Sequence, residues 1–274
     1  AAPALALPAA SRRARRCRRP AANSGAKVRK PPAVAWRHTL TVHTVASLAL
    51  NQQLAHDIAH RLRDAIQTRG SAVLSVSGGK SPIALFEALR VIDIAWSHVR
   101  VTLVDERCVP YTHPDSNACL VRTHLLQDRA ASAQLVPMVD ATSEPLSAPS
   151  VYADHAELAL RAAGIADVLV LGMGADGHTA SLFPEAPNLA DALAPNNPHA
   201  CLAIELPTPP ANAPYPRITQ TLAYLLTARH IVLPLSGADK LQTLKHVWPE
   251  ATPSLPISMV LHQTQTPVAL WLAN

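Results

Sequence analysis

The sequence has little glycine, few aromatic residues and no long hydrophobic run. Only nine of its 274 residues are glycine and 4% are aromatic, although 49% are hydrophobic. A chain of this length and hydrophobicity can bury one large core, and the scarcity of aromatic residues predicts that this core is mostly aliphatic. No apolar run approaches the roughly 18 residues that a membrane-spanning helix needs. We therefore predict a soluble protein without a membrane partner.

Cysteine is also scarce and lacks the spacing of a metal or redox motif. The four cysteines form no CxxC pair and no zinc-type pattern, and they stand at Cys17, Cys108, Cys119 and Cys201. Reduced cysteines of the cytosol or an organelle matrix fit this pattern best. Cys108 follows Arg107, but without a partner base it is more typical of a packed small residue than of a reactive thiol. We predict no metal site.

Acidic residues are missing from the first 56 positions, which hold ten Lys and Arg; the first carboxylate is Asp57. The rest of the chain has 14 basic and 19 acidic residues, so the formal net charge of +5 comes from the amino-terminal segment. We predict that residues 1–33, rich in Ala, Pro, Arg and Ser, are a disordered basic extension. A transit peptide, translation from a misplaced start and, third, a nucleic-acid-binding arm remain open as its origin. The domain itself shows no basic face, so no nucleic-acid partner is expected.

Beyond residue 33, apolar runs of strand length alternate with segments of helical periodicity. The predicted strands lie at 72–76, 99–104, 134–138, 168–171, 202–206, 231–235 and 268–272. The predicted helices lie at 45–68, 82–90, 116–126, 150–163, 217–226 and 240–246. This alternation predicts a single α/β domain over residues 34–274, with a mostly parallel, doubly wound sheet and helices on both faces.

Six of the nine glycines fall in three loops that each follow a strand-like run: Gly78 and Gly79; Gly172, Gly174 and Gly177; and Gly237. In open α/β sheets, ligands bind at the carboxyl ends of the strands. One such loop would be typical of a tight turn, but three favour a binding site.

The first of these loops has the features of an anion site. In SGGKSP (Ser77–Pro82), a helix opens at Pro82 directly after the glycines, so free backbone N–H groups converge there, with Lys80 and Ser81 beside them. The GxxxxGK[ST] spacing is absent, so a single sugar-type phosphate is predicted rather than a nucleotide triphosphate. Arg217, at an expected helix start, and Lys240, just after Gly237, could complete a phosphate clamp, although each alone is more often a solvated surface charge.

His178 is the best candidate for a general base, because an ordinary imidazole has a pKa near 6.5. Asp176, two residues earlier, could orient it. The DER segment places Asp105, Glu106 and Arg107 at a strand end, as part of a site or as an ion-pair cluster that holds loops together. No GxSxG elbow occurs, and metal-site spacing is absent elsewhere, so metal-free acid–base chemistry is expected.

Five motifs in order resemble the 6-phosphogluconolactonases of the glucosamine/galactosamine-6-phosphate isomerase superfamily. They are SGGKSP (77–82), DER with DSN (105–107, 115–117), GMGADGHTASLFP (172–184), PRIT (216–219) and GADK (237–240). The related glucosamine-6-phosphate deaminases carry DEY and GHIAFNEP-like sequences in place of DER and GHTASLFP. The resemblance covers the chain from about residue 36 onward and favours the lactonases.

The resemblance implies a fold of the glucosamine-6-phosphate deaminase and ribose-5-phosphate isomerase type. It also implies hydrolysis of 6-phospho-D-glucono-1,5-lactone to 6-phosphogluconate, the second step of the oxidative pentose phosphate pathway, without metal or cofactor. His178 would deprotonate water, Asp176 would help to place it, and Arg107 or loop amides would stabilise the oxyanion. The implied substrate-binding residues are Ser77, Gly78, Gly79, Lys80, Ser81, Asp105, Glu106, Arg217 and Lys240.

Two other functions remain open at this point. One is an isomerase or deaminase acting on an amino-sugar phosphate, and the other is a sugar-phosphate sensor that binds without turnover. For the lactonase we expect a cytoplasmic monomer or small homo-oligomer; a transit peptide in residues 1–33 would place it in an organelle matrix instead.

Overall fold

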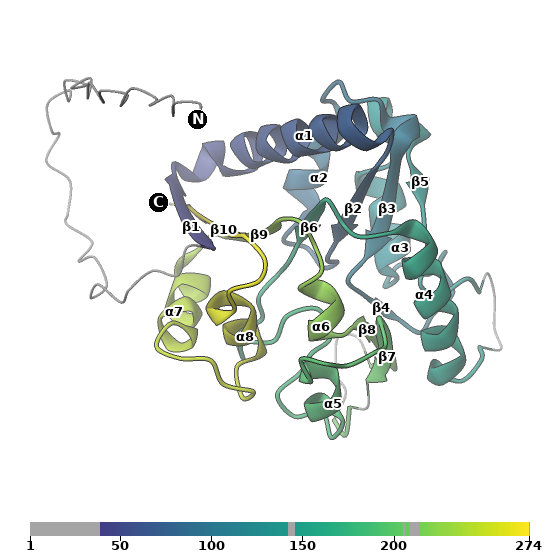
Figure 1. The fold of residues 1–274 in the computed structure, drawn as a ribbon, viewed down its shortest axis with the longest axis vertical. Coiled ribbons are helices and arrows are strands. Elements are labelled where there is room, and N and C mark those ends of the chain that lie inside the picture. The colour runs from purple at the N-terminus through teal and green to yellow at the C-terminus, as the bar shows by residue number, and fades with distance from the viewer. Residues whose placement is uncertain (1–38, 142–145, 205, 209–213, 274) are drawn as a thin grey trace, which may run out of the picture. The chain divides into compact units, whose positions relative to one another are not determined.

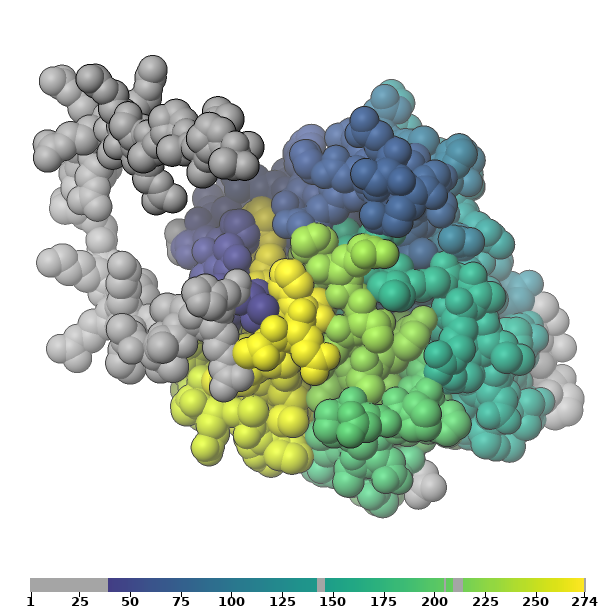
Figure 2. Space-filling model, viewed as in Figure 1, coloured from purple at the N-terminus to yellow at the C-terminus, as the bar shows by residue number. Residues whose placement is uncertain are grey.

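A parallel sheet of seven strands forms the centre of the molecule (Figure 1). The structure, a computed structural model, describes residues 39–141, 146–204, 206–208 and 214–273. In spatial order, the strands are β1 (Leu40–Val45), β10 (Val268–Ala273), β9 (Ile231–Leu235), β6 (Val168–Val170), β2 (Ala72–Val76), β3 (Val99–Leu103) and β5 (Gln134–Leu135). In Figure 2 the yellow carboxyl-terminal segment lies between the purple first strand and the green middle of the chain, as this order requires.

The sheet has a core on each face, because alternate side chains of a strand point to opposite sides. Val168 and Val170 belong to one hydrophobic cluster, together with residues of α1 and α2, whereas Leu169 and Leu171 belong to another with residues of α7 and α8. In Figure 1, α1 lies on one side of β1, β10 and β9, and α7 and α8 lie on the other. The predicted doubly wound parallel sheet is therefore confirmed.

The helices of the described residues differ greatly in length. They are α1 (Leu50–Arg69), α2 (Ile83–Arg90), α3 (Asn117–His124), α4 (Pro149–Ala163), α5 (Leu189–Leu193), α6 (Leu222–Leu225), α7 (Ala238–Val247) and α8 (Pro256–His262). Short 3₁₀ segments cover Ser47–Ala49, Trp96–His98 and Asp128–Ser132. Within the described part of the chain, no helix is both long and apolar enough to cross a membrane.

A second, antiparallel sheet of three strands lies beside the main sheet. Its order is β4 (Asp105–Arg107), β8 (Arg217–Gln220) and β7 (Cys201–Ile204). Arg107 is directly opposite Arg217 in the β4–β8 pair. This small sheet therefore brings together two arginines that are 110 positions apart in the sequence.

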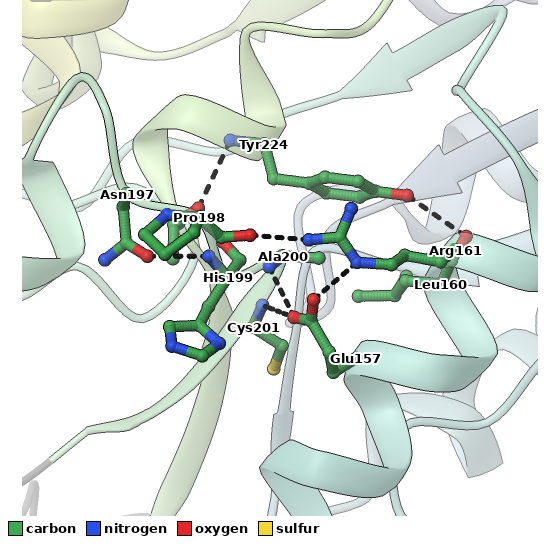
Figure 3. A network of polar contacts seen from close by, with 10 residues as sticks. Glu157, Leu160, Arg161, Asn197, Pro198, His199, Ala200, Cys201 and Tyr224 are labelled. Atoms are coloured by element: carbon green, nitrogen blue, oxygen red, sulfur yellow. Dashed lines mark hydrogen bonds and ion pairs between the residues drawn. The ribbon is translucent and has the colours of Figure 1, made fainter.

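A polar network anchors the small sheet to α4 (Figure 3). The carboxylate of Glu157 accepts hydrogen bonds from the backbone N–H of Ala200 and, at 3.1 Å, of Cys201, and it pairs with Arg161 at 2.5 Å. Arg161 also donates to the carbonyl oxygen of Pro198 at 2.5 Å. Burial alone would raise the pKa of Glu157, but these donors outweigh it and lower the pKa. The start of β7 is thereby fixed to the helix.

Several predicted boundaries are wrong. The predicted helix 217–226 is instead strand β8 followed by the short helix α6, because β8 pairs with β4 and β7. The predicted helix 45–68 begins at Leu50; a 3₁₀ segment, Ser47–Ala49, precedes it, and Leu40–Val45 form the unpredicted edge strand β1. Helices α5 and α8 were not predicted. The predicted disordered extension, residues 1–33, lies outside the described residues.

Candidate active site

A cavity of about 380 Å³ lies at the carboxyl ends of the parallel strands. Its walls come from the three glycine-containing loops after β2, β6 and β9, from the first turn of α1 and from the small sheet. Strand order reverses between β2 and β6: β2 continues to β3 and β5, whereas β6 continues to β9 and β10. A cavity at such a switch point is the usual ligand site of an open α/β sheet.

His178 lines this cavity, and its imidazole is held by Asp176, which does not line the cavity. Nδ1 of His178 lies 2.6 Å from Oδ1 of Asp176, and the backbone N–H of His178 donates to the same oxygen at 3.2 Å. Burial by itself would raise the pKa of Asp176, but the hydrogen bonds and charge of His178 bring it below the ordinary value. Asp176 therefore stays ionised and favours the tautomer that carries the proton on Nδ1. Among the described residues, Nε2 has no hydrogen-bond partner, so it is the nitrogen available for proton transfer.

Gly174 makes this pairing possible because it lies so close to both side chains. A β-carbon at Gly174 would lie 2.1 Å from Nδ1 of His178 and 2.4 Å from Oδ1 of Asp176, which is shorter than van der Waals contact allows. Its backbone N–H donates to the carbonyl oxygen of His178 at 2.8 Å. The loop after β6 thus needs glycine at this position to hold the His–Asp pair.

Arg107 and Arg217 form the cationic wall of the cavity. Nη1 of Arg107 donates to the carbonyl oxygen of Asp115 at 2.6 Å and to Oδ1 of Asn117 at 3.0 Å. Arg217 is only 5% exposed. Burial lowers its pKa, while the charge of Asp105 acts in the opposite direction. Two guanidinium groups held side by side and partly desolvated favour an anionic ligand or an oxyanion.

The carboxylate of Asp105 joins the arginine wall to the His178 loop. It is 6% exposed and accepts a hydrogen bond of 2.6 Å from the hydroxyl of Ser181, which lies three residues after His178. The amide of Asn117 donates to the backbone oxygen of Asp105 at 2.8 Å. These buried contacts fix the small sheet and the loop after β6 relative to one another.

Two of the predicted substrate-binding residues do not line the cavity. Glu106 is 1% exposed, and its carboxylate accepts hydrogen bonds from the backbone N–H groups of Arg107, Asn117 and Ala118 and from the hydroxyl of Ser116. Through these hydrogen bonds it fixes the start of α3 to β4. Lys80 is exposed outside the cavity.

The remaining predicted site residues line the cavity, with the exception of Asp176. They are Ser77, Gly78, Gly79, Ser81, Asp105, Arg107, His178, Arg217 and Lys240. Gly78 packs so tightly on Asn117 that a β-carbon there would lie 1.8 Å from Oδ1 of that side chain. Lys240, in the first turn of α7, is half-buried and donates from Nζ to the carbonyl oxygen of Met173. The loops after β2, β6 and β9 therefore meet at one end of the cavity.

The lining residues that the sequence reasoning did not assign to the site include Asn51, Asn117 and Phe183. Asn51 comes from α1, whose first turn has neither a side-chain cap nor an acidic residue. Asn117 and Phe183 stand within the DSN and GMGADGHTASLFP motifs, so their position beside charged residues was the available signal.

Metal-ligating side chains do not cluster in the described ranges: no group of three or more His, Cys, Asp or Glu is placed to hold an ion. Burial raises the pKa of the Cys108 thiol to about 12. It is therefore a packed side chain rather than a thiolate, as its sequence context indicated.

The comparison with known families agrees with the fold and the cavity. The family described as "Glucosamine-6-phosphate isomerases/6-phosphogluconolactonase" matches residues 27–271, and the chain belongs to this family.

Similar proteins carry the name of the lactonase branch. A 6-phosphogluconolactonase of Neisseria meningitidis serogroup A is 41% identical over 212 residues, which cover 77% of this chain and 89% of that protein. A 6-phosphogluconolactonase of Pseudomonas aeruginosa is 45% identical over 193 residues, covering 70% of this chain and 77% of that protein. The crystal structure of a 6-phosphogluconolactonase from Shewanella baltica has a TM-score of 0.79 at 37% identity, and the match covers 88% of this chain and 100% of that one.

Proposed function

We propose that this protein hydrolyses 6-phospho-D-glucono-1,5-lactone to 6-phosphogluconate, with His178 as the general base. The observation that carries the proposal is the His178–Asp176 pair, in which Asp176 holds Nδ1 of a histidine that lines a cavity with cationic walls. Relatives named 6-phosphogluconolactonase, at 41% and 45% identity, support the same reaction. The pair suits deprotonation of a water molecule that attacks the lactone carbonyl.

The proposed sequence of events starts with the phosphate. The N–H groups at Gly79, the hydroxyl of Ser81 and the charges of Lys240 and Arg217 hold the phosphate, and this grip fixes the lactone carbonyl near His178. His178 takes a proton from water as the oxygen attacks the carbonyl carbon, and a tetrahedral oxyanion forms. Arg107 stabilises that oxyanion. The ring C–O bond then breaks, and the proton returns from His178 to the departing ring oxygen.

We further propose that the reaction takes place in the cytoplasm, in a monomer or small homo-oligomer that needs no partner other than the lactone. The state of the described cysteines supports this location: Cys108, Cys119 and Cys201 are all free thiols. Reducing compartments keep thiols in this state.

Phosphate recognition can be tested with two lactones and two lysine variants. We expect the wild type to open the phosphorylated lactone with a kcat/KM at least about 100-fold above that for unphosphorylated gluconolactone, because the phosphate contacts position the carbonyl. Lys240→Met should raise KM for the phosphorylated lactone about tenfold or more, since it removes one charge-assisted contact. Lys245→Met, an exposed position on the same helix, should leave KM unchanged.

Equal rates on the two lactones, or a Lys240→Met enzyme with the wild-type KM, would contradict the proposal. Release of ammonia from an amino-sugar phosphate would instead identify a deaminase, and tight binding of 6-phosphogluconate without any turnover would identify a sensor.

A further inference from the structure

The chain has two phenylalanines, and one of them lies beside the proposed base. Phe86 is buried in the main core at 1% exposure, whereas Phe183 is half-buried and lines the cavity. The ring centroids of Phe183 and His178 are 4.5 Å apart, with 36° between the ring planes. The guanidinium carbon of Arg217 lies 5.4 Å from the same Phe183 centroid. One aromatic ring therefore contacts both the imidazole and the buried arginine.

A constrained turn brings Phe183 to this position. Ala180 has a φ of 50°, in the left-handed region that residues with a β-carbon rarely adopt. The turn closes through a hydrogen bond of 3.0 Å from the N–H of Leu182 to the oxygen of Thr179. Such a conformation persists where surrounding contacts hold it in place, and it occurs often at functional sites.

Buried hydrogen bonds on both sides of Ala180 hold it in this conformation. Thr179 is fully buried and donates from Oγ1 to the carbonyl oxygen of Gly172 at 2.8 Å. Ser181 is also fully buried and donates from Oγ to Asp105 at 2.6 Å. With its neighbours fixed, the turn reverses the chain within five residues, so that Phe183 returns to the face of His178.

We infer that Phe183 is a positioning residue for His178, an inference that rests on the proposed function. Asp176 holds the imidazole at Nδ1, but one side-chain hydrogen bond leaves the ring free to swing about that contact. The aromatic ring packed against the imidazole face removes this freedom. Nε2 then remains directed at the reacting water.

The first test compares the same substitution at the two phenylalanines. Phe183→Leu should lower kcat about tenfold, because a loosened base spends less time in the reactive geometry. KM should change less than about twofold, since the β8–β4 pairing fixes the backbone of Arg217 and the other proposed phosphate contacts do not involve Phe183. Phe183→Tyr keeps an aromatic ring at this position, so its kcat should equal the wild-type value. Phe86→Leu should lower the melting temperature but leave kcat at the wild-type value.

The second test reads the imidazole directly by ¹⁵N NMR at a pH where His178 is neutral, with His178→Ala used to assign its signals. The wild type should show a single tautomer with the proton on Nδ1 and sharp signals, and Phe183→Leu should keep this tautomer but shift and broaden the Nε2 signal, because the imidazole then changes orientation about its contact with Asp176. This readout does not need turnover, so it decides the inference even if the wild type fails to hydrolyse the lactone. A kcat within about twofold of wild type in Phe183→Leu, or a lower kcat with unchanged ¹⁵N shifts, would overturn the inference.

Discussion

Asp176 accepts two hydrogen bonds from one residue, His178, through the side chain and through the backbone. This arrangement keeps the carboxylate ionised although burial opposes its charge. An ionised Asp176 favours the proton on Nδ1, and in the proposed reaction it would stabilise the imidazolium that forms when Nε2 accepts a proton. The sequence could indicate this pair, because the two residues lie in one short loop and need no distant partner.

Glu106 shows how an adjacent residue in a motif can have a different role. Its carboxylate is surrounded by donors, yet burial raises its pKa from the ordinary 4.5 to about 7. A raised pKa in the folded state means that the folded protein binds a proton that the unfolded chain releases above about pH 4.5. The stabilising contribution is therefore complete below pH 4.5 and is lost as the pH rises through about 7.

We predict that the free energy of unfolding of the wild type falls between pH 5 and pH 7 more steeply than that of Glu106→Gln. The difference in slope should reach at most about 1.4 kcal/mol per pH unit, the value for one proton. Urea unfolding at several pH values in this window measures it. Parallel profiles for the two proteins would mean that Glu106 is already ionised in the folded state, and would refute the assignment.

At the scale of elements, the strands of the buried parallel sheet could be predicted, and the edge strand β1 could not. β2, β9 and β10 are nearly continuous apolar runs, because both faces of a parallel sheet are covered. β1 lies at the sheet edge with several exposed residues, so it has no such run. A continuous apolar run indicates a buried strand, and β1 is too exposed to have one.

β8 and β4 illustrate a different limit. The residues from Arg217 onward resemble the start of a helix, but antiparallel pairing with β4 and β7 makes Arg217–Gln220 a strand. The same pairing explains why Asp105 and Arg107 line the cavity and Glu106 does not, since alternate residues of a strand point to opposite faces. These partners are distant in sequence, so no local pattern reveals them.

The loop after β6 provides a prediction with a matched control. Gly174→Ala should lower kcat/KM at least about tenfold, because its β-carbon would displace the His178–Asp176 pair. Gly172→Ala introduces the same methyl group into the same loop, but the nearest atom there, Oγ of Ser77, would lie 3.6 Å away, an ordinary contact. Steady-state kinetics should therefore separate the two variants. Equal activity would show that the close approach at Gly174 does not matter for the reaction.

At the scale of the whole molecule, the fold places the cavity. The chain builds β2, β3 and β5 on one side of the switch point and β6, β9 and β10 on the other. The loops leaving β2 and β6 therefore diverge and open a cavity between them. The small antiparallel sheet closes another wall with Arg107 and Arg217. The glycine positions in the sequence indicated a cavity at the strand ends. The wall formed by the small sheet depends on tertiary pairing and could not be indicated in this way.

The most direct test of the account is the rate at which freshly generated 6-phosphogluconolactone opens at mildly acidic pH, where spontaneous hydrolysis is slower. The wild type and His246→Ala, an exposed histidine on α7, should accelerate the reaction equally. His178→Ala should lose about 10²- to 10⁴-fold in kcat, the usual contribution of a general base. A folded His178→Ala enzyme with wild-type kcat, or a wild type that binds the phosphate but does not accelerate opening, would contradict the account.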